Sequence, residues 1–186
     1  TDSGVNAGTI AVTVDGTAVS NITKTAIDGG YKCTCTSPTL KDGSHTISVK
    51  ASDNDGNAAV AKTATFTIDT VPPTLQITAP SNDLITNQKA VTVTGKTDDA
   101  TSKPVTVTVN GAAVTVGTNG TFTKEVTLAE GANTITIVAK DKAGKTTTVT
   151  RKVTVNTSAP VIKSITLSPN PVDCGKTFII AVEITD

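Results

Sequence analysis

Apolar and polar residues alternate with a period of two along most of this 186-residue chain. The segment TIAVTVDGTAV at positions 9–19 shows the alternation, and PVTVTVNGAAV at positions 104–114 repeats it. Because successive side chains of a strand point to opposite faces of a sheet, the pattern predicts strands with one buried face. Both segments are predicted to be β-hairpins, since each contains a pair typical of a tight turn, Asp15-Gly16 or Asn110-Gly111.

The repetition extends beyond these hairpins, and one module occurs twice. Residues 40–59 (LKDGSHTISVKASDNDGNAA) correspond to residues 128–147 (LAEGANTITIVAKDKAGKTT). Residues 66–73 (FTIDTVPP) correspond in the same way to residues 153–160 (VTVNTSAP). Internal repetition of this kind is typical of tandem domain arrays.

The second occurrence of the module is complete and covers about residues 71–157. Turn residues separate its short apolar-alternating segments, and none of them has helical periodicity. We expect seven strands there: PTLQITAP, AVTVTGKT, PVTVTVNG, AAVTV, GTFTKEVTL, NTITIVAKD and TTTVTRKVTV. This number of short strands in one module predicts an all-β fold, a tandem of immunoglobulin-like β-sandwiches with one complete central domain.

The two ends of the chain are expected to hold complementary partial domains. Residues 1–70 begin at the equivalent of the third strand and supply strands C to G, whereas residues 158–186 supply only strands A and B. A half sandwich exposes an apolar face and an unpaired strand edge. Two explanations stay open: donation of residues 158–186 to residues 1–70 of a neighbouring copy, which builds a head-to-tail filament, or an excerpt from a longer tandem array.

Four stretches carry a family resemblance: DTVPPTLQITAPSN, the VNG hairpin, LAEGANTITIVAKDKAG and TVNTSAP. Together they resemble the bacterial Ig-like domains that occur in tandem on surface adhesins, secreted polysaccharide-active enzymes and phage tail proteins. Residues 166–186 are similar to the opening two strands of another such domain, of a kind also seen in phage tail proteins. The resemblance implies an Ig-like fold in an extracellular, secreted or cell-surface bacterial protein, and it carries over no catalytic residue.

These features favour a non-catalytic structural module of an extracellular filament or surface stalk, whose partners are copies of itself. The alternatives are an adhesin or carbohydrate-binding accessory region, with a cell-surface or carbohydrate ligand, and a phage tail segment. Lys and Arg total 16 and Asp and Glu total 16, so no excess charge points to nucleic acid. No apolar run approaches the roughly 18–20 residues of a membrane span. Aromatic residues make up 2% of the chain and Trp is absent, which leaves few platforms for sugar rings.

The three cysteines give the most specific expectation. Cys33 and Cys35 lie two apart on a predicted strand, which is too stretched for an easy mutual disulfide. Cys174 precedes the B-like strand, which in Ig topology pairs with the E-like strand that carries the other two. If neighbouring copies combine, an intermolecular disulfide is expected from Cys174 to Cys35, with Cys33 as second choice. The alternative is three buried free thiols. A zinc site is not expected, because the three cysteines and His45 lack the spacing of zinc ligands.

The last strand, FIIAVEITD, has an apolar face of its own. Its alternate residues are expected to point inward when the strand is donated to another copy. They would then fill a core that the first domain leaves open. The donated set is Phe178, Ile180, Val182 and Ile184, and the open core comprises Ile10, Val12, Val14, Ile47 and Val49.

Other candidate chemistry is sparse. The stretch DNDGN makes Asp53 and Asp55 weak candidates for Ca²⁺ ligands, but neither it nor Asp98-Asp99 has the spaced ligand set of a strong calcium loop. Turn chemistry is the simpler explanation of DNDGN. His45 is expected to be a solvated residue at a strand start, and carboxylates such as Asp42 and Asp28 lie in turns. No nucleophile, base and acid form a constellation, so we predict no enzyme and no cofactor.

Overall fold

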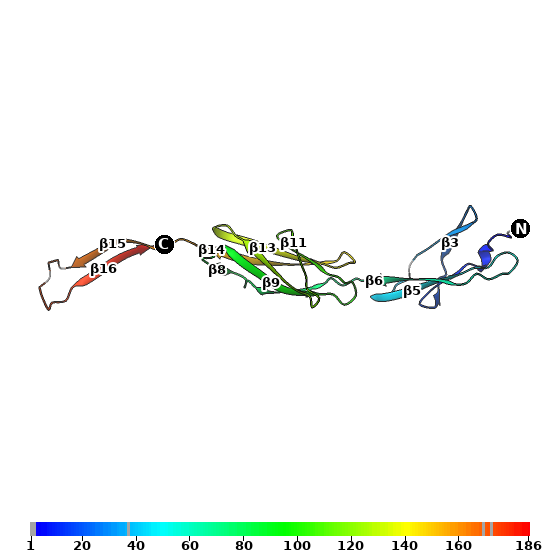
Figure 1. The fold of residues 1–186 in the computed structure, drawn as a ribbon, viewed down its shortest axis with the longest axis horizontal. Coiled ribbons are helices and arrows are strands. Elements are labelled where there is room, and N and C mark those ends of the chain that lie inside the picture. Colours follow the sequence, from blue (N-terminus) through cyan, green and yellow to red (C-terminus); the bar gives the residue numbers. More distant parts are fainter. Residues whose placement is uncertain (1–2, 37, 169, 172) are drawn as a thin grey trace.

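The computed structural model of this chain describes residues 3–36, 38–168, 170–171 and 173–186. Within these residues the fold consists of strands and one 3-10 turn, η1 (Ala7–Thr9), without an α-helix. No helix of the described part is therefore long and apolar enough to span a membrane. Figure 1 shows three parts in a row: a first unit near the N-terminus, a central unit and a C-terminal hairpin. The predicted all-β fold class is confirmed.

The central unit consists of two sheets. Its strands are β7 (Thr74–Ala79), β8 (Leu84–Thr86), β9 (Ala90–Asp98), β10 (Thr106–Val109), β11 (Ala112–Val114), β12 (Thr121–Thr127), β13 (Gly131–Lys140) and β14 (Thr146–Val155). One sheet has the strand order β11-β10-β13-β14-β8, and the other has the order β12-β9-β7. Neighbouring strands are antiparallel except for β8, which runs parallel to β14. The sequence predicts seven of these eight strands and misses β8.

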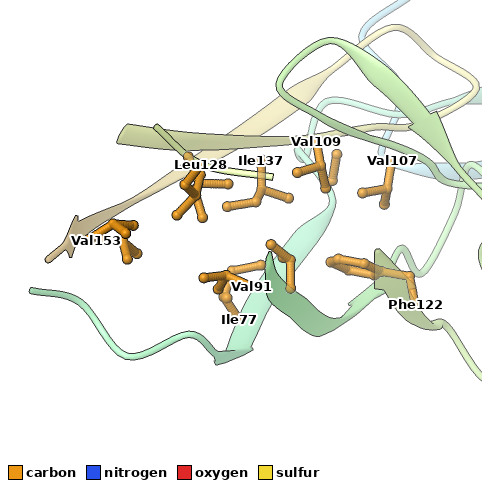
Figure 2. Close-up of a cluster of buried hydrophobic side chains, with 12 residues drawn as sticks. Ile77, Val91, Val107, Val109, Phe122, Leu128, Ile137 and Val153 are labelled. Carbon is orange, nitrogen blue, oxygen red and sulfur yellow. The ribbon is translucent and has the colours of Figure 1, made fainter. Parts of the chain in front are cut away.

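The core of the central unit lies between its two sheets and is mainly aliphatic. Val93, Ile135 and Ile137 are completely buried, and Phe122 supplies the one ring of the cluster. Figure 2 shows side chains of the two sheets pointing toward one another across this space. Full burial of a side chain of this size contributes about 1.5–3 kcal/mol. The period-two pattern of the sequence therefore translates directly into a packed sandwich core.

The first unit repeats one sheet of this architecture. Its strands are β1 (Ala11–Val14), β2 (Thr17–Ala18), β3 (Ile22–Ile27), β4 (Gly30–Cys35), β5 (Gly43–Lys50) and β6 (Lys62–Ile68). Four of them form a sheet in the order β2-β1-β5-β6, which is the counterpart of β11-β10-β13-β14. The other two, β3 and β4, pair only with each other among the described residues.

Both tight turns expected from the sequence are present. Asp15 and Gly16 have φ values of 48° and 80°, and Asn110 and Gly111 have the same two values. Positive φ at both central residues defines the two-residue hairpin turn that Asp-Gly and Asn-Gly favour. The two predicted hairpins, β1–β2 and β10–β11, are therefore confirmed.

The C-terminal hairpin consists of β15 (Val161–Ser168) and β16 (Ile179–Thr185). The two strands are antiparallel, and their register shifts by one residue between Ile162 and Ser164. The pairing of β7 with β9 has a similar shift, between Ile77 and Ala79. The hairpin is therefore the structural counterpart of the first two long strands of the central unit.

Candidate assembly interface

The C-terminal hairpin exposes apolar side chains on both of its faces. In β15, Ile162 and Ile165 are exposed, and so is Ile179 at the start of β16. The four residues expected to be donated, Phe178, Ile180, Val182 and Ile184, are between 46% and 58% exposed. Contiguous exposed apolar surface marks interaction sites. The hairpin thus offers an apolar surface for a further sheet to cover.

The pairing register shows which face of β16 corresponds to a buried face. Leu75 of β7 lies opposite Thr97, and Ile162 of β15 lies opposite Ile184. Ile162 is the counterpart of Leu75, because each stands two residues after the proline that ends the repeated segment, residues 66–73 or residues 153–160. The expected inward residues of β16 therefore stand at the positions of four buried residues of β9. From Phe178 to Ile184, these counterparts are Val91, Val93, Gly95 and Thr97.

Within the described part of the chain, β16 has one strand neighbour, whereas its counterpart β9 has two. β9 pairs with β7 at one edge and with β12 at the other. Among the described residues β16 pairs with β15 alone, so its other edge is open. An open edge presents unpaired backbone N–H and C=O groups to any strand that can dock there.

The first unit has a matching open edge at β4. This strand is the counterpart of β12, because each follows a glycine with positive φ, Gly29 or Gly120, and precedes a repeated leucine, Leu40 or Leu128. β12 pairs with β9, but β4 has no such neighbour within the described part of the chain. Because β16 is the counterpart of β9, a strand like β16 is what β4 lacks as a neighbour.

The core of the first unit is open only in part. The structure buries Ile10, Val12 and Val14, contrary to the expectation that all five core residues lie open. Parts of the first unit itself lie near these residues: Lys24 of β3 donates to the carbonyl oxygen of Ala7 at 2.6 Å, and Val14 lines a cleft with Pro38 and Leu40. Val49 of β5 is 37% exposed and Ile47 is half-buried, although their counterparts in the central unit are fully buried. The uncovered part of this core therefore lies along β5.

All three cysteines are free and exposed. The three thiols are therefore not buried within the single chain, and the choice between free thiols and an intermolecular disulfide stays open. Cys33 and Cys35 stand two residues apart on β4, the strand with the open edge. Cys174 lies in a turn that precedes β16. A disulfide from Cys174 to Cys35, with Cys33 as second choice, stays a prediction.

His45 is not the solvated residue expected from the sequence, because its side chain is only 11% exposed. Its Nδ1 lies 2.6 Å from Oδ2 of Asp15, and its Nε2 lies 2.8 Å from the carbonyl oxygen of Lys41. Both oxygens are acceptors, so the doubly protonated ring satisfies both contacts. The hydrogen bond to Asp15, followed by that to Lys41, raises the pKa of His45, and the same bond to His45 lowers the pKa of Asp15. The pair acts as a structural clasp between the β1–β2 turn and β5.

The weak calcium candidates Asp53 and Asp55 lie in a turn of the first unit. Oδ1 of Asp53 accepts a hydrogen bond from the backbone N of Asn57 at 2.8 Å, and Oδ2 accepts one from its side-chain Nδ2 at 2.8 Å. These bonds, that from the side chain first, lower the pKa of Asp53. Asp55 is exposed. The two oxygens of Asp53 are thus engaged within the turn, as turn chemistry predicts.

A carboxylate clamp fastens the end of each sandwich unit. In the first unit, the backbone N and Oγ1 of Thr70 each donate to Asp42 Oδ1 at 3.0 Å. In the central unit, the backbone N and Oγ1 of Thr157 donate to the two oxygens of Glu130 at 2.8 Å. These bonds lower the pKa of Glu130, the backbone one most. Asp42 and Glu130 are equivalent in the repeat, so the clamps fix the direction in which the chain leaves each unit.

Two family models match the chain. Residues 2–70 match the model of a bacterial Ig-like domain, and residues 73–157 match the model described as glucodextranase, domain B. The first match confirms, for residues 2–70, the resemblance to bacterial Ig-like domains that was inferred from the sequence.

Individual proteins resemble the chain over most of its length. Bacillopeptidase F of Bacillus subtilis (strain 168) is 30% identical over 158 residues, which is 85% of this chain, and the chain spans 11% of that relative. The fibronectin(III)-like modules of Clostridium thermocellum CbhA are 18% identical with a TM-score of 0.46, over 84% of this chain and 80% of theirs. A tetra-tandem repeat in the extending region of a large adhesion protein is 19% identical with a TM-score of 0.41, over 98% of this chain and 56% of its own.

Proposed function

We propose that this chain of Ig-like domains is a non-catalytic structural module of an extracellular bacterial filament or surface stalk. In this proposal copies join head to tail by strand complementation, with β16 of one copy beside β4 of the next. The alternative is that the same pairing occurs between consecutive domains of one longer parent chain. The experiments below distinguish this alternative from joining between separate copies. The relative named as a peptidase matches over only 11% of its length, so peptidase activity is no part of the proposal.

The register of the C-terminal hairpin carries the proposal. It exposes Phe178, Ile180, Val182 and Ile184 at the positions where β9 buries its own inner face. In the central unit β12 pairs with β9, and the counterpart of β12 is the open-edged strand β4. The hairpin and the first unit lie at opposite ends of the row (Figure 1), so one contact repeated from copy to copy extends the row indefinitely.

The joints between units support a role as a spacer. Each joint follows a clamp, Thr70 on Asp42 or Thr157 on Glu130, and each contains proline. Proline fixes one backbone angle and cannot enter a helix interior, so it limits the freedom of the linking segment. A row of small sandwiches with short, fastened joints is suited to setting reach and spacing.

The energetics predict weak joining by strand pairing alone. Each donated side chain contributes about 1.5–3 kcal/mol when fully buried. Since the four are already about half covered, docking adds roughly 3–6 kcal/mol, whereas association costs about 4–15 kcal/mol. Backbone pairing, a disulfide or avidity must supply the remainder. This balance makes the cysteines a natural part of the proposal.

Sedimentation velocity of the purified chain over a hundredfold concentration range tests the joining. The expected result is a concentration-dependent series of oligomers, with filaments visible by negative-stain microscopy. Ile180→Asp places a charge where Val93 is completely buried in the central unit, and it should abolish the series. Ile179→Asp is the matched control, because it changes the opposite face of the same strand and should leave the series intact.

Two results would contradict joining between copies. One is a chain that remains monomeric at every concentration. The pairing would then occur only between consecutive domains of a longer parent chain. The other is an Ile180→Asp protein whose filaments match the parent in length and thermal resistance.

Non-reducing electrophoresis of thiol-blocked native material tests the disulfide. We expect a ladder of covalent oligomers that collapses on reduction. Cys174→Ser and Cys35→Ser should each abolish the ladder, while Cys33→Ser should leave it. A ladder that survives Cys174→Ser would show that this cysteine does not join the copies.

A further inference from the structure

Three carboxylates converge where the first unit meets the central unit. Asp69 follows β6, Asp99 follows β9, and Asp141 follows β13. One carboxylate oxygen of each lies within 4.8 Å of an oxygen of each of the others. Asp99 and Asp141 are 6% and 5% exposed, and Asp69 is half-buried. Segments distant in sequence thus place three acidic groups in one largely buried spot.

One oxygen of each carboxylate has a structural role. Oδ1 of Asp69 accepts from the backbone N of Val71 at 3.2 Å, and Oδ1 of Asp141 accepts from that of Lys145 at 2.8 Å. Oδ1 of Asp99 accepts from the backbone N–H groups of Thr101 and Ser102 at 2.8 and 2.6 Å. These bonds orient the carboxylates, and they are ordinary turn chemistry.

The second oxygens of Asp69 and Asp141 are not explained by turn chemistry. Oδ2 of Asp69 and Oδ2 of Asp141 are buried and have no hydrogen-bond partner. The ion pairs among the described residues are His45 with Asp15 and Lys103 with Asp98, and neither includes the three carboxylates. Burying an ionised carboxylate without a partner is costly, and burying it beside two others is more so. A cation between them would remove this cost.

The repeat supplies an internal comparison. Asp53 is the counterpart of Asp141 and makes the same turn, but its Oδ2 accepts from the side chain of Asn57 at 2.8 Å. Asn156 is the counterpart of Asp69, and its Oδ1 accepts from the backbone N of Ser158 at 3.0 Å, as Asp69 does from Val71. The equivalent turns at Asp53 and Asn156 therefore form without an unpartnered carboxylate oxygen. Such oxygens occur only at the joint between the first unit and the central unit, among the described residues.

We propose that Asp69, Asp99 and Asp141 bind one Ca²⁺ ion. Calcium takes six to eight oxygen ligands at about 2.3–2.6 Å, so two ligand oxygens on opposite sides of the ion lie about 5 Å apart, which agrees with the spacing of the carboxylates. The candidate ligands are all carboxylate oxygens, which suits a hard cation such as calcium better than zinc. A cleft of ≈ 420 Å³ lined by Asp42, Asp69, Pro72 and Asp99, among others, gives the ion a path from solvent. The bound ion ties the outgoing end of the first unit to two loops of the central unit and stiffens their joint.

Isothermal titration of the full chain with Ca²⁺ tests this site. We expect one ion per chain with a dissociation constant of about 10⁻³ M or tighter. Calcium should also shift the NMR signals of the backbone amides of Val71, Ser102 and Lys145, which donate to the three carboxylates. This test is independent of strand complementation, because an Ile180→Asp protein that does not assemble should bind calcium equally well.

Asp69→Asn is the decisive variant, because Asn156 shows that asparagine supports the same turn. It should weaken calcium binding at least about tenfold, equivalent to about 1.4 kcal/mol. Asp53→Asn is the matched control and should change the affinity less than twofold. A parent chain that binds no calcium would overturn the proposal. Equal loss of binding in Asp53→Asn and Asp69→Asn would overturn it as well.

Discussion

The first unit and the central unit derive from one repeated module, yet only the central unit has two long-strand sheets around a closed core. Ile135 and Ile137 are completely buried, whereas their counterparts Ile47 and Val49 are half-buried and exposed. The strand sequences are similar, so propensity does not explain the difference. The central unit contains β7, β8 and β9 in addition to the strands that the two units share. Burial of a strand residue is thus decided by the sheet opposite it, which local sequence does not encode.

The largest difference between the units is expected from core truncation. Ile135→Ala should destabilise the central unit by about 2–5 kcal/mol, because it leaves a cavity in a closed core. Ile47→Ala should cost only about 1–2 kcal/mol, because its side chain is partly in water already. Hydrogen exchange of the full chain, followed by mass spectrometry, reports the two units separately. Equal losses in the two units would show that the first unit has a closed core in solution.

A second comparison concerns the glycines that precede the E-like strands. Gly120 and Gly29 have φ values of 80° and 73°. A Cβ on Gly120 would collide with the carbonyl oxygen of Thr97 in β9, whereas one on Gly29 meets open space. Gly120→Ala should therefore cost roughly 2–4 kcal/mol and Gly29→Ala only about 1–2 kcal/mol. Urea unfolding followed by circular dichroism measures both, and equal costs would contradict the view that β4 lacks the neighbour that β12 has.

The third comparison uses pH. The raised pKa of His45 means that its clasp contributes stability below the ordinary histidine value of about 6.5 and loses that contribution as the pH rises through the raised value. The lowered pKa of Asp15 means that the contribution is also lost as the pH falls through that lowered value. The first unit should therefore become less stable as the pH rises above about 6.5, and His45→Asn should flatten this dependence. The central unit has Asn133 and Asn110 at these positions and should not follow it.

The smallest effect is expected from the clamps. Glu130→Gln should slightly lower the melting temperature, because a charged acceptor of two hydrogen bonds from Thr157 becomes neutral. The lowered pKa of Glu130 means that the clamp weakens as the pH falls through that value, so the variant should differ from the parent at pH 7 and converge with it in acid. Asp42→Asn makes the same change in the first unit. Calorimetry at pH 7 measures both variants, and for Glu130→Gln a difference from the parent that persists in strong acid would contradict the account.

The sequence predicted the parts of the fold that depend on local chemistry. The Asp15-Gly16 and Asn110-Gly111 turns followed from residues that tolerate positive φ, and the long strands followed from alternation. β8 was missed because three residues carry no periodicity and its pairing with β14 is long-range. The burial of His45 was missed because it depends on Asp15 and on the carbonyl of Lys41. The convergence of Asp69 with Asp141 could not be read from sequence, since which oxygen lacks a partner is known only once every neighbour is placed.

The parallel pairing of β8 with β14 has a mechanical consequence. The chain enters the central unit near the start of β14, where Thr147 donates to the carbonyl of Pro73, and it leaves from the end of that strand. A stretching force applied through the two ends therefore pulls β8 and β14 in opposite directions along their length. The ladder from Leu84 to Thr86, with the added bond from the backbone N of Asn156 to Thr86, is then loaded in shear. Bonds loaded in shear must break together rather than one after another, so a domain with this layout resists tension far better than its equilibrium stability alone would indicate.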